Sequence, residues 1–176
     1  SAFFEGFDNP NKWLVTNDEK WSSNESLAQL DSTQHYELII FDSDPAFILD
    51  VLRNLRSGNA SYTLYATEYQ LFNNGITNDN FMREAEVICA MSSYLSYQNS
   101  NTLLFVEAFR AHFGIEPNNY AIRGFDIADY HVIRTLYGEC PMRGIYLGFD
   151  HTQGKENKWV ELRRFENFEW NLLRHP

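Results

Sequence analysis

Residues 36–67, "YELIIFDSDPAFILDVLRNLRSGNASYTLYAT", predict a strand, a turn, a helix and a second strand. The nearly continuous apolar run from Leu38 to Phe41 is typical of a strand covered on both faces. Pro45 indicates the first turn of a helix and Gly58 its end. One face of that helix is apolar, with Ile48, Val51, Leu52 and Leu55. A strand, a helix and a strand in this order favour a parallel pair.

The rest of the chain continues the alternation. Further strands are expected at 12–17, 85–91, 144–149 and 158–165, and further helices at 22–30, 101–114 and 125–138. We therefore predict a single α/β domain over residues 1–176, a three-layer α/β/α sandwich with a mainly parallel sheet. In it, strands 37–41, 62–66 and 86–91 are adjacent and parallel, and the last two strands pair antiparallel. The polar loop 72–80 is expected to be long and mobile.

Two of the expected helices show a face of aligned side chains. The helix at 101–114 aligns Phe105, Ala108, Phe109, His112 and Phe113, with Gly114 as its cap. The helix at 125–138 aligns Tyr130, Ile133 and Tyr137.

The charge of the chain excludes one class of function. The formal net charge is −10, and residues 1–120 carry 16 acidic against 6 basic residues. A nucleic-acid-binding domain needs basic surface to displace counterions, so we expect no nucleic-acid partner. No apolar run approaches the roughly 20 residues that span a bilayer, and residues 1–5 lack the features of a signal peptide. The two cysteines, Cys89 and Cys140, allow either one disulfide or two free thiols, of which the free thiols are favoured.

The aspartates after the first buried strand raise the possibility of a phosphatase. A strand that ends in D-x-D, here Asp42 and Asp44, resembles the nucleophile and acid/base pair of haloacid dehalogenase phosphatases, and Asp126 and Asp129 resemble the Mg²⁺ ligands of that family. No lysine follows an expected core strand, however, and Pro45 stands where that family has a Gly-Thr-like turn.

A second interpretation needs no chemistry, because Asp42 and Asp44 can satisfy the amides of a strand-to-helix turn, with Asp44 as N-cap. The histidines show no metal-ligand spacing such as H-x-x-x-H, and no glycine-rich phosphate loop occurs. We therefore expect no enzyme activity, no metal and no cofactor.

Several phrases resemble a known family. Four segments follow one another in a fixed order along the chain. They are residues 37–56 with "YTLYATEY" (62–69), "AEVICAMSSYLSYQNSNTLLFVEAFRAHFGIEP" (85–117), "PNNYAIRGFDIA" (117–128) and "GKENKWVEL" (154–162). Over roughly residues 37–170, the series resembles the second lobe of type I periplasmic binding proteins, the branched-chain amino acid receptor family. In that family the phrase at 117–128 is structural. The resemblance implies that Tyr120 packs under the sheet, that Gly124 permits close approach and that Asp126 begins a helix.

The resemblance also implies a location and a function. The family holds a ligand between two lobes and is about twice this length, so the chain is expected to be one lobe of an exported protein of the periplasm or cell envelope, acting as a non-enzymatic ligand-binding or receptor-like domain. Family receptors often carry an aromatic residue just before the proline that corresponds to Pro45, where this chain has Asp44. The alternative is therefore a protein-interaction or scaffolding domain of an envelope lipoprotein, with a protein partner and no small-molecule ligand.

The candidate site follows from the topology. In open parallel sheets ligands bind beyond the carboxyl ends of the strands. The expected ligand-binding residues at these ends are Asp42, Ser43, Asp44, Glu68, Tyr69, Tyr94 and Tyr97. Carboxylates there favour a small polar, cationic or zwitterionic molecule. A receptor would gather Asp44, Glu68 and Tyr69 in one concave site, whereas an interaction domain would scatter them and expose an apolar patch.

Overall fold

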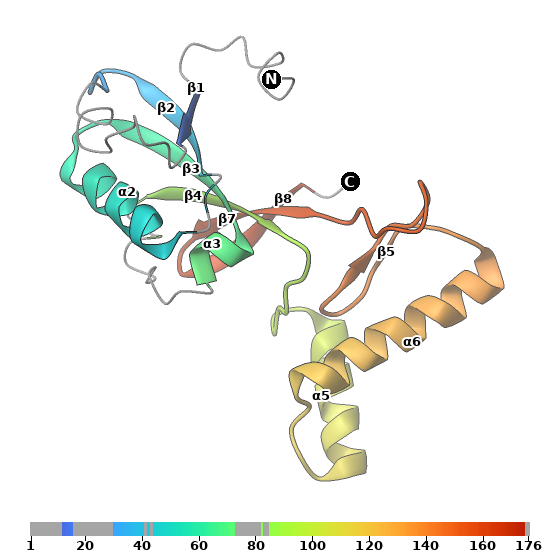
Figure 1. Ribbon diagram of the computed structural model, residues 1–176. Helices are drawn as coiled ribbons and strands as arrows, with labels where there is room; N and C mark the ends of the chain where they lie inside the picture. Colours follow the sequence, from blue (N-terminus) through green and yellow to red (C-terminus); the bar gives the residue numbers. More distant parts are fainter. Residues whose placement is uncertain are drawn as a thin grey trace. The chain divides into compact units, whose positions relative to one another are not determined.

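The computed structural model describes residues 12–15, 30–40, 42, 44–72, 82 and 85–174. The chain divides into two compact units (Figure 1). The first comprises Ser1–Ala90 with Leu162–Leu173, and the second comprises Met91–Glu161 with Arg174–Pro176. The prediction of one domain over residues 1–176 stays a prediction. The expected helix at 22–30 and most of the expected loop at 72–80 lie outside the described residues.

The first unit is built on a six-stranded sheet. The strands are β1 (Lys12–Val15), β2 (His35–Ile40), β3 (Ser61–Thr67), β4 (Glu86–Met91), β7 (Glu161–Glu166) and β8 (Glu169–Arg174), in the spatial order β1-β2-β3-β4-β7-β8. The pairs β1–β2, β2–β3 and β3–β4 are parallel. Leu38 lies opposite Leu64, and Leu64 opposite Val87. The mixed α/β class with a mainly parallel sheet is confirmed, and so are the adjacent parallel strands.

Helix α2 (Pro45–Ser57) makes the crossover from β2 to β3. Its buried side chains are the four aligned in the sequence, Ile48, Val51, Leu52 and Leu55. Asp44 is the N-cap, and its carboxylate accepts a hydrogen bond from Ala46 N–H at 3.0 Å. Pro45 occupies the first turn, where its missing N–H is harmless. Gly58 ends the helix and donates its N–H to the carbonyls of Asn54 and Leu55.

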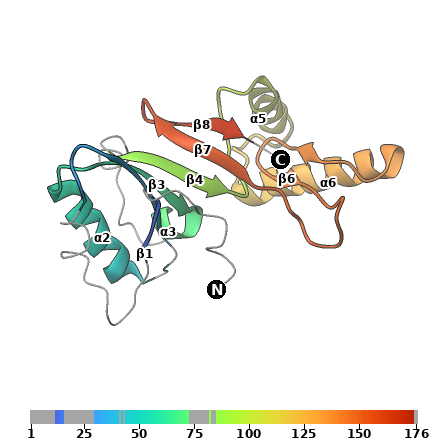
Figure 2. The same cartoon turned by 90° about the horizontal axis from the view of Figure 1, so that it is seen from above.

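The predicted pairing of the last two strands is wrong. Residues 148–149 form β6 (Gly148–Phe149), which pairs antiparallel with β5 (Met142–Arg143) in a separate sheet. Strand β7 instead lies beside β4 and β8 (Figure 2). A two-residue turn at Asn167 and Phe168, both with positive φ, joins β7 to β8, as in a tight hairpin. The turn between β7 and β8 contains no Gly or Pro, so the sequence showed no sign of it.

The second unit contains α5 (Ser100–Phe113), a five-residue connection and α6 (Asn119–Tyr137), with the β5–β6 hairpin. Helix α6 begins six residues before the predicted start at 125, because the Asn118 side chain caps it by accepting from Ala121 N–H at 2.9 Å. Asp126 therefore lies inside the helix and does not begin it. Tyr120 is 82% exposed and does not pack under a sheet. A Cβ at Gly124 would meet no atom within 4 Å, so no close approach requires this glycine.

The predicted helix faces are only partly correct. Helix α5 buries Thr102 and Val106, while Ala108, His112 and Phe113 are exposed. Helix α6 buries Ile122, Asp126 and Tyr130, but Tyr137 is 77% exposed. The aligned phenylalanines of α5 thus lie beside its buried stripe and not within it. A single sequence shows which residues share a face, but not which face another element covers.

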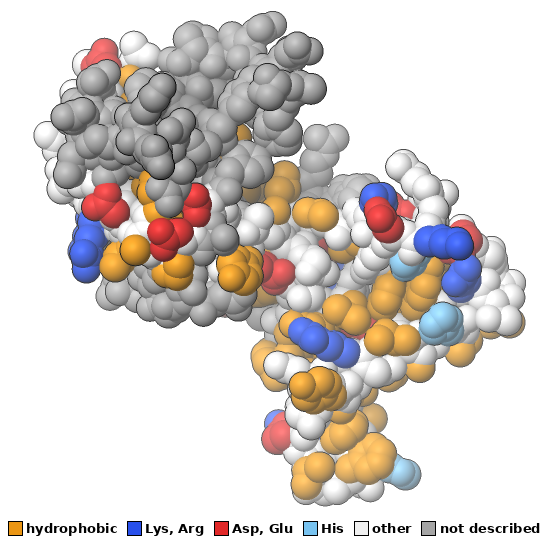
Figure 3. Space-filling model, in the orientation of Figure 1, with side chains coloured by type: hydrophobic (Ala, Val, Ile, Leu, Met, Phe, Trp, Pro, Cys, Tyr) orange, Lys and Arg blue, Asp and Glu red, His pale blue; other side chains and the backbone are white. Residues whose placement is uncertain are grey.

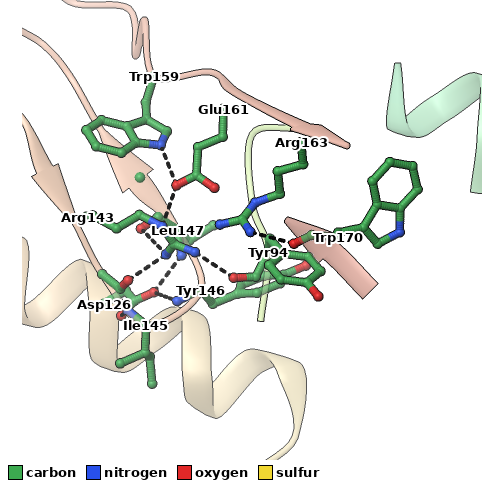
Figure 4. Close-up of polar contacts among 12 residues, drawn as sticks. Tyr94, Asp126, Arg143, Ile145, Tyr146, Leu147, Trp159, Glu161, Arg163 and Trp170 are labelled. Atoms are coloured by element: carbon green, nitrogen blue, oxygen red, sulfur yellow. Dashed lines mark hydrogen bonds and ion pairs between the residues drawn. The ribbon is translucent and has the colours of Figure 1, made fainter. Parts of the chain in front are cut away.

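Asp126 is the polar centre of the second unit. Its fully buried carboxylate accepts from the N–H groups of Ile145 (2.8 Å), Tyr146 (2.8 Å) and Leu147 (2.7 Å). Gly144 directly precedes these three residues, and a Cβ there would collide with the same carboxylate. One aspartate therefore fixes the turn before β6 against the middle of α6 (Figure 4).

We expect Asp126→Ala to destabilise the second unit by about 3 kcal/mol or more, because three backbone N–H groups lose their acceptor inside the protein. Urea unfolding followed by far-ultraviolet circular dichroism measures the change. Asp129→Ala, three residues along the same helix and half-buried, is the matched control and should stay within about 0.5 kcal/mol of the parent chain. Equal losses for the two variants would contradict the role given to Asp126.

Candidate functional site: the carboxyl edge of the parallel sheet

The carboxyl ends of β2 and β3 are held together by one side chain. Gln70 belongs to α3 (Glu68–Phe72), the short helix that follows β3, and is 6% exposed. Its Nε2 donates to the carbonyls of Ile40 (2.8 Å) and Asp42 (2.9 Å). Its Oε1 accepts from Thr67 N–H (2.9 Å) and Thr67 Oγ1 (3.1 Å). We call this region, formed by Asp42, Asp44, Glu68, Tyr69 and Gln70, the carboxyl edge.

The two aspartates of the D-x-D stretch support the turn. The Asp42 carboxylate accepts from Asp44 N–H at 2.7 Å, and the Asp44 carboxylate caps α2. The capping interpretation of the sequence therefore describes both contacts. Asp44 is also exposed, so its second carboxylate oxygen faces a solvent-accessible edge.

Glu68 and Tyr69 come directly after β3, at the same edge. Glu68 is half-buried, and Tyr69 is 53% exposed. The charge of Glu68 also reaches β4. Burial, and secondarily the Glu68 carboxylate, raise the pKa of the Cys89 thiol to about 12. The edge therefore carries acidic residues after β2 and β3, and Cys89 of β4 is a neutral thiol at physiological pH.

The seven predicted site residues are divided between the two units. Asp42 and Asp44 share the turn after β2, and Gln70 joins this turn to the α3 segment that carries Glu68 and Tyr69. Tyr94 and Tyr97 belong to the second unit. Tyr94 pairs its N–H with Tyr146 O at 2.9 Å, and Tyr97 is 59% exposed. Ser43 lies outside the described residues.

The second unit holds a polar cluster that the sequence did not reveal (Figure 4). Arg143 forms an ion pair with Glu161 at 2.5 Å, and Glu161 is 2% exposed. The same guanidinium donates to Tyr94 O at 2.7 Å and Gly144 O at 2.5 Å. These contacts satisfy carbonyls of the loops around β5, so the cluster is structural. Its partners are up to 49 residues apart in the chain, and no local motif marks such a distance.

Asn157 organises the following loop in the same way. Its Oδ1 accepts from Asp150 N–H (2.8 Å) and Trp159 N–H (3.1 Å), and its Nδ2 donates to Gly148 O (2.8 Å). Asn157 lies in the stretch "GKENKWVEL" (154–162), which is part of the family resemblance. Its side chain there satisfies backbone groups of the loop.

Three of the four aspartates of the phosphatase hypothesis have structural partners. Asp42 and Asp44 support the turn into α2, and Asp126 binds three backbone amides. Among the described residues, no three His, Cys, Asp or Glu side chains lie close enough to hold a metal ion. No helix in the described part of the chain is long and apolar enough to cross a membrane. Cys89 and Cys140 are both free, as favoured from the sequence.

An apolar band crosses the two helices of the second unit. On α5 the rings of Phe105, Phe109 and Phe113 follow one another with centroid distances of 5.8 and 4.5 Å. Phe105 also contacts Phe125 of α6 at 4.7 Å. Val132 and Leu136 continue the face of Phe125 along α6 and are 55% and 67% exposed. We call these six residues the apolar band. Figure 3 shows hydrophobic side chains gathered over these helices.

Known protein-family models and curated proteins give no match to the sequence. Two solved structures share part of the fold. One is an ABC transporter substrate-binding protein from Desulfitobacterium hafniense in complex with leucine, with a TM-score of 0.46 and 17% identity over 78% of this chain and 43% of that chain. The other is an ABC transporter solute-binding protein from R. palustris in complex with benzoate, with a TM-score of 0.41 and 13% identity over 79% and 42%. The chain spans less than half the length of either protein.

Proposed function

We propose that this chain is a non-enzymatic ligand-binding lobe of a cell-envelope protein, and that the carboxyl edge receives a small cationic or zwitterionic molecule. The observation that carries the proposal is the Gln70 bridge. It fixes the ends of β2 and β3 to each other, so that the Asp42–Asp44 turn and the Glu68–Tyr69 segment are held at one edge. A ligand site needs groups held in place before the ligand arrives.

The charges at the carboxyl edge suggest the class of ligand. The Asp44 and Glu68 carboxylates attract an ammonium group and repel a simple anion. The N-terminus of α2 begins at the same place, and its positive dipole end favours a negative group. A molecule that carries both an ammonium and a carboxylate matches this combination. Tyr69 can add an aromatic contact to an apolar side chain or to a cation.

Asp44→Asn tests the proposal without removing the helix cap, because asparagine caps about as well as aspartate. We expect unchanged thermal stability and about tenfold weaker binding of amino acids, measured by calorimetric titration of a panel of the twenty amino acids. Glu156→Gln, an exposed carboxylate of the second unit, is the control and should leave the affinity unchanged. Binding that is unaffected by Asp44→Asn, or absent for the whole panel, would reject the proposal.

A second candidate function is protein binding through the apolar band. Phe113, Phe125, Val132 and Leu136 of the band are all exposed, and gathered exposed apolar side chains mark interaction sites. Residues 99–138 carry 4 acidic and 3 basic residues, a net charge of −1 out of −10 for the chain. Like-charge repulsion between two copies is therefore small at this surface. We propose a second copy of the chain as its occupant, with the two bands facing each other in an isologous dimer.

Leu136→Glu tests the dimer, because it places a charge within the proposed contact. Sedimentation velocity across the micromolar range should show dimers for the parent chain and monomers for this variant. Leu172→Glu is the matched control, a similarly exposed leucine of β8 in the first unit, and should leave the dimer intact. A parent chain that is monomeric throughout, or equal dissociation of both variants, would exclude this occupant.

A further inference from the structure

We propose that the second unit contains a separate binding site for a small aromatic or planar anion, a carboxylate or a phosphate ester. The site is a hollow of about 450 Å³ between the C-terminal half of α6 and the loop after β6. Its lining residues are Ile127, Tyr130, His131, Arg134, Glu139, Phe149, His151, Gly154 and Lys155. They all belong to the second unit, so the inference is independent of the carboxyl edge and goes beyond the proposed function.

The lining is cationic in an otherwise acidic chain. Arg134 and Lys155 face a single carboxylate, that of Glu139. Arg134 forms an ion pair with Glu139, which offsets the carboxylate and leaves the charge of Lys155 in excess. The two imidazoles of His131 and His151 add further donors. An anion therefore meets a site with a surplus of positive charge, whereas a cation meets no uncompensated carboxylate among the lining residues.

The acceptor capacity of Glu139 is also partly occupied. Tyr130 donates its hydroxyl to Glu139 Oε2 at 3.0 Å, while Arg134 binds the other carboxylate oxygen. Burial, with the Glu139 contact second, raises the pKa of Tyr130, so the phenol keeps its proton and remains a donor. Glu139 therefore orients Tyr130 and Arg134 and leaves little acceptor capacity for a cationic ligand.

Aromatic rings are part of the lining of the hollow. The rings of Tyr130 and Phe149 stack with centroids 4.5 Å apart and an interplanar angle of 8°, and both residues are buried. His151 lies with its ring 5.7 Å from that of Tyr130. Ile127 adds an aliphatic wall. A ligand with a planar apolar part can pack against this apolar and aromatic lining while its anionic group reaches Lys155. The hollow therefore suits an aromatic or planar anion.

The test uses the whole chain with two anionic probes, phenylacetate and phenyl phosphate, and two analogues of similar shape, benzyl alcohol and benzylammonium. Calorimetric titration gives affinities, and backbone amide NMR shifts locate the bound probe. We expect binding of the anions only, with shifts concentrated at residues 127–134 and 149–155. Binding of benzylammonium or benzyl alcohol as tight as that of the anions, or no binding of either anion, would overturn the proposal.

Three substitutions distinguish binding in this hollow from general electrostatic attraction to the protein. Lys155→Gln should weaken anion binding about tenfold, and Lys155→Arg should retain it. Lys158→Gln is the matched control, because Lys158 lies three residues away in the same loop, pairs with Glu156 at 2.7 Å and is not part of the lining. Equal loss in the Lys155→Gln and Lys158→Gln variants would show that only the net charge matters and would reject a built site.

Discussion

The proposed ligand site at the carboxyl edge depends on the hydrogen bonds of the Gln70 carboxamide. Parallel strands leave free carbonyls and amides at their carboxyl ends, and these need partners when buried. A single glutamine satisfies groups on β2 and β3 with both of its polar atoms. The chain can then turn directly into α2 and α3, and the carboxylates at the turns stay at the edge of the sheet. Without such a partner, the two strand ends would have to move apart until water could reach their backbone groups.

The second unit is held by the same principle at other positions. In the region after α6 the strands are only two residues long, so many backbone N–H and C=O groups have no strand partner. Side chains bind such groups instead, namely those of Asp126, Asn157 and Arg143. Few hydrophobic side chains of α5 and α6 are covered within the unit, and the apolar band remains exposed. The unit therefore combines a well-bonded polar interior with an apolar surface. The proposed dimer contact rests on this apolar surface.

The sequence was sufficient wherever the signal was local. Pro45, Gly58 and the apolar periodicity between them predicted α2 and its buried face, and three parallel strands were placed correctly. The D-x-D turn could be interpreted through capping alone. Asp126 was beyond such reasoning, because its partners lie 19 to 21 residues away and its helix starts at Asn118 and not at the aspartate.

The residues of the two proposed sites divide in the same way. Asp42, Asp44, Glu68 and Tyr69 were predicted from topology, because strand ends are predictable when the strands are. Gln70 was missed, since a single glutamine shortly after a strand gives no sign that it bridges two strand ends. The lining of the hollow on α6 was missed as well. His131, Arg134, His151 and Lys155 have no metal or catalytic spacing, and only the folded loop after β6 brings them to one place.

The most direct test of the account is a residue-by-residue map of backbone amide NMR shifts while an amino acid that binds is titrated into the unmodified chain. The account predicts that the largest shifts fall at residue 42, at residues 44–48 and at residues 67–70, the two segments that Gln70 joins, and that the two segments titrate with one common affinity. Shifts that occur elsewhere, or two segments that respond with different affinities, would contradict a single ligand site at the carboxyl edge.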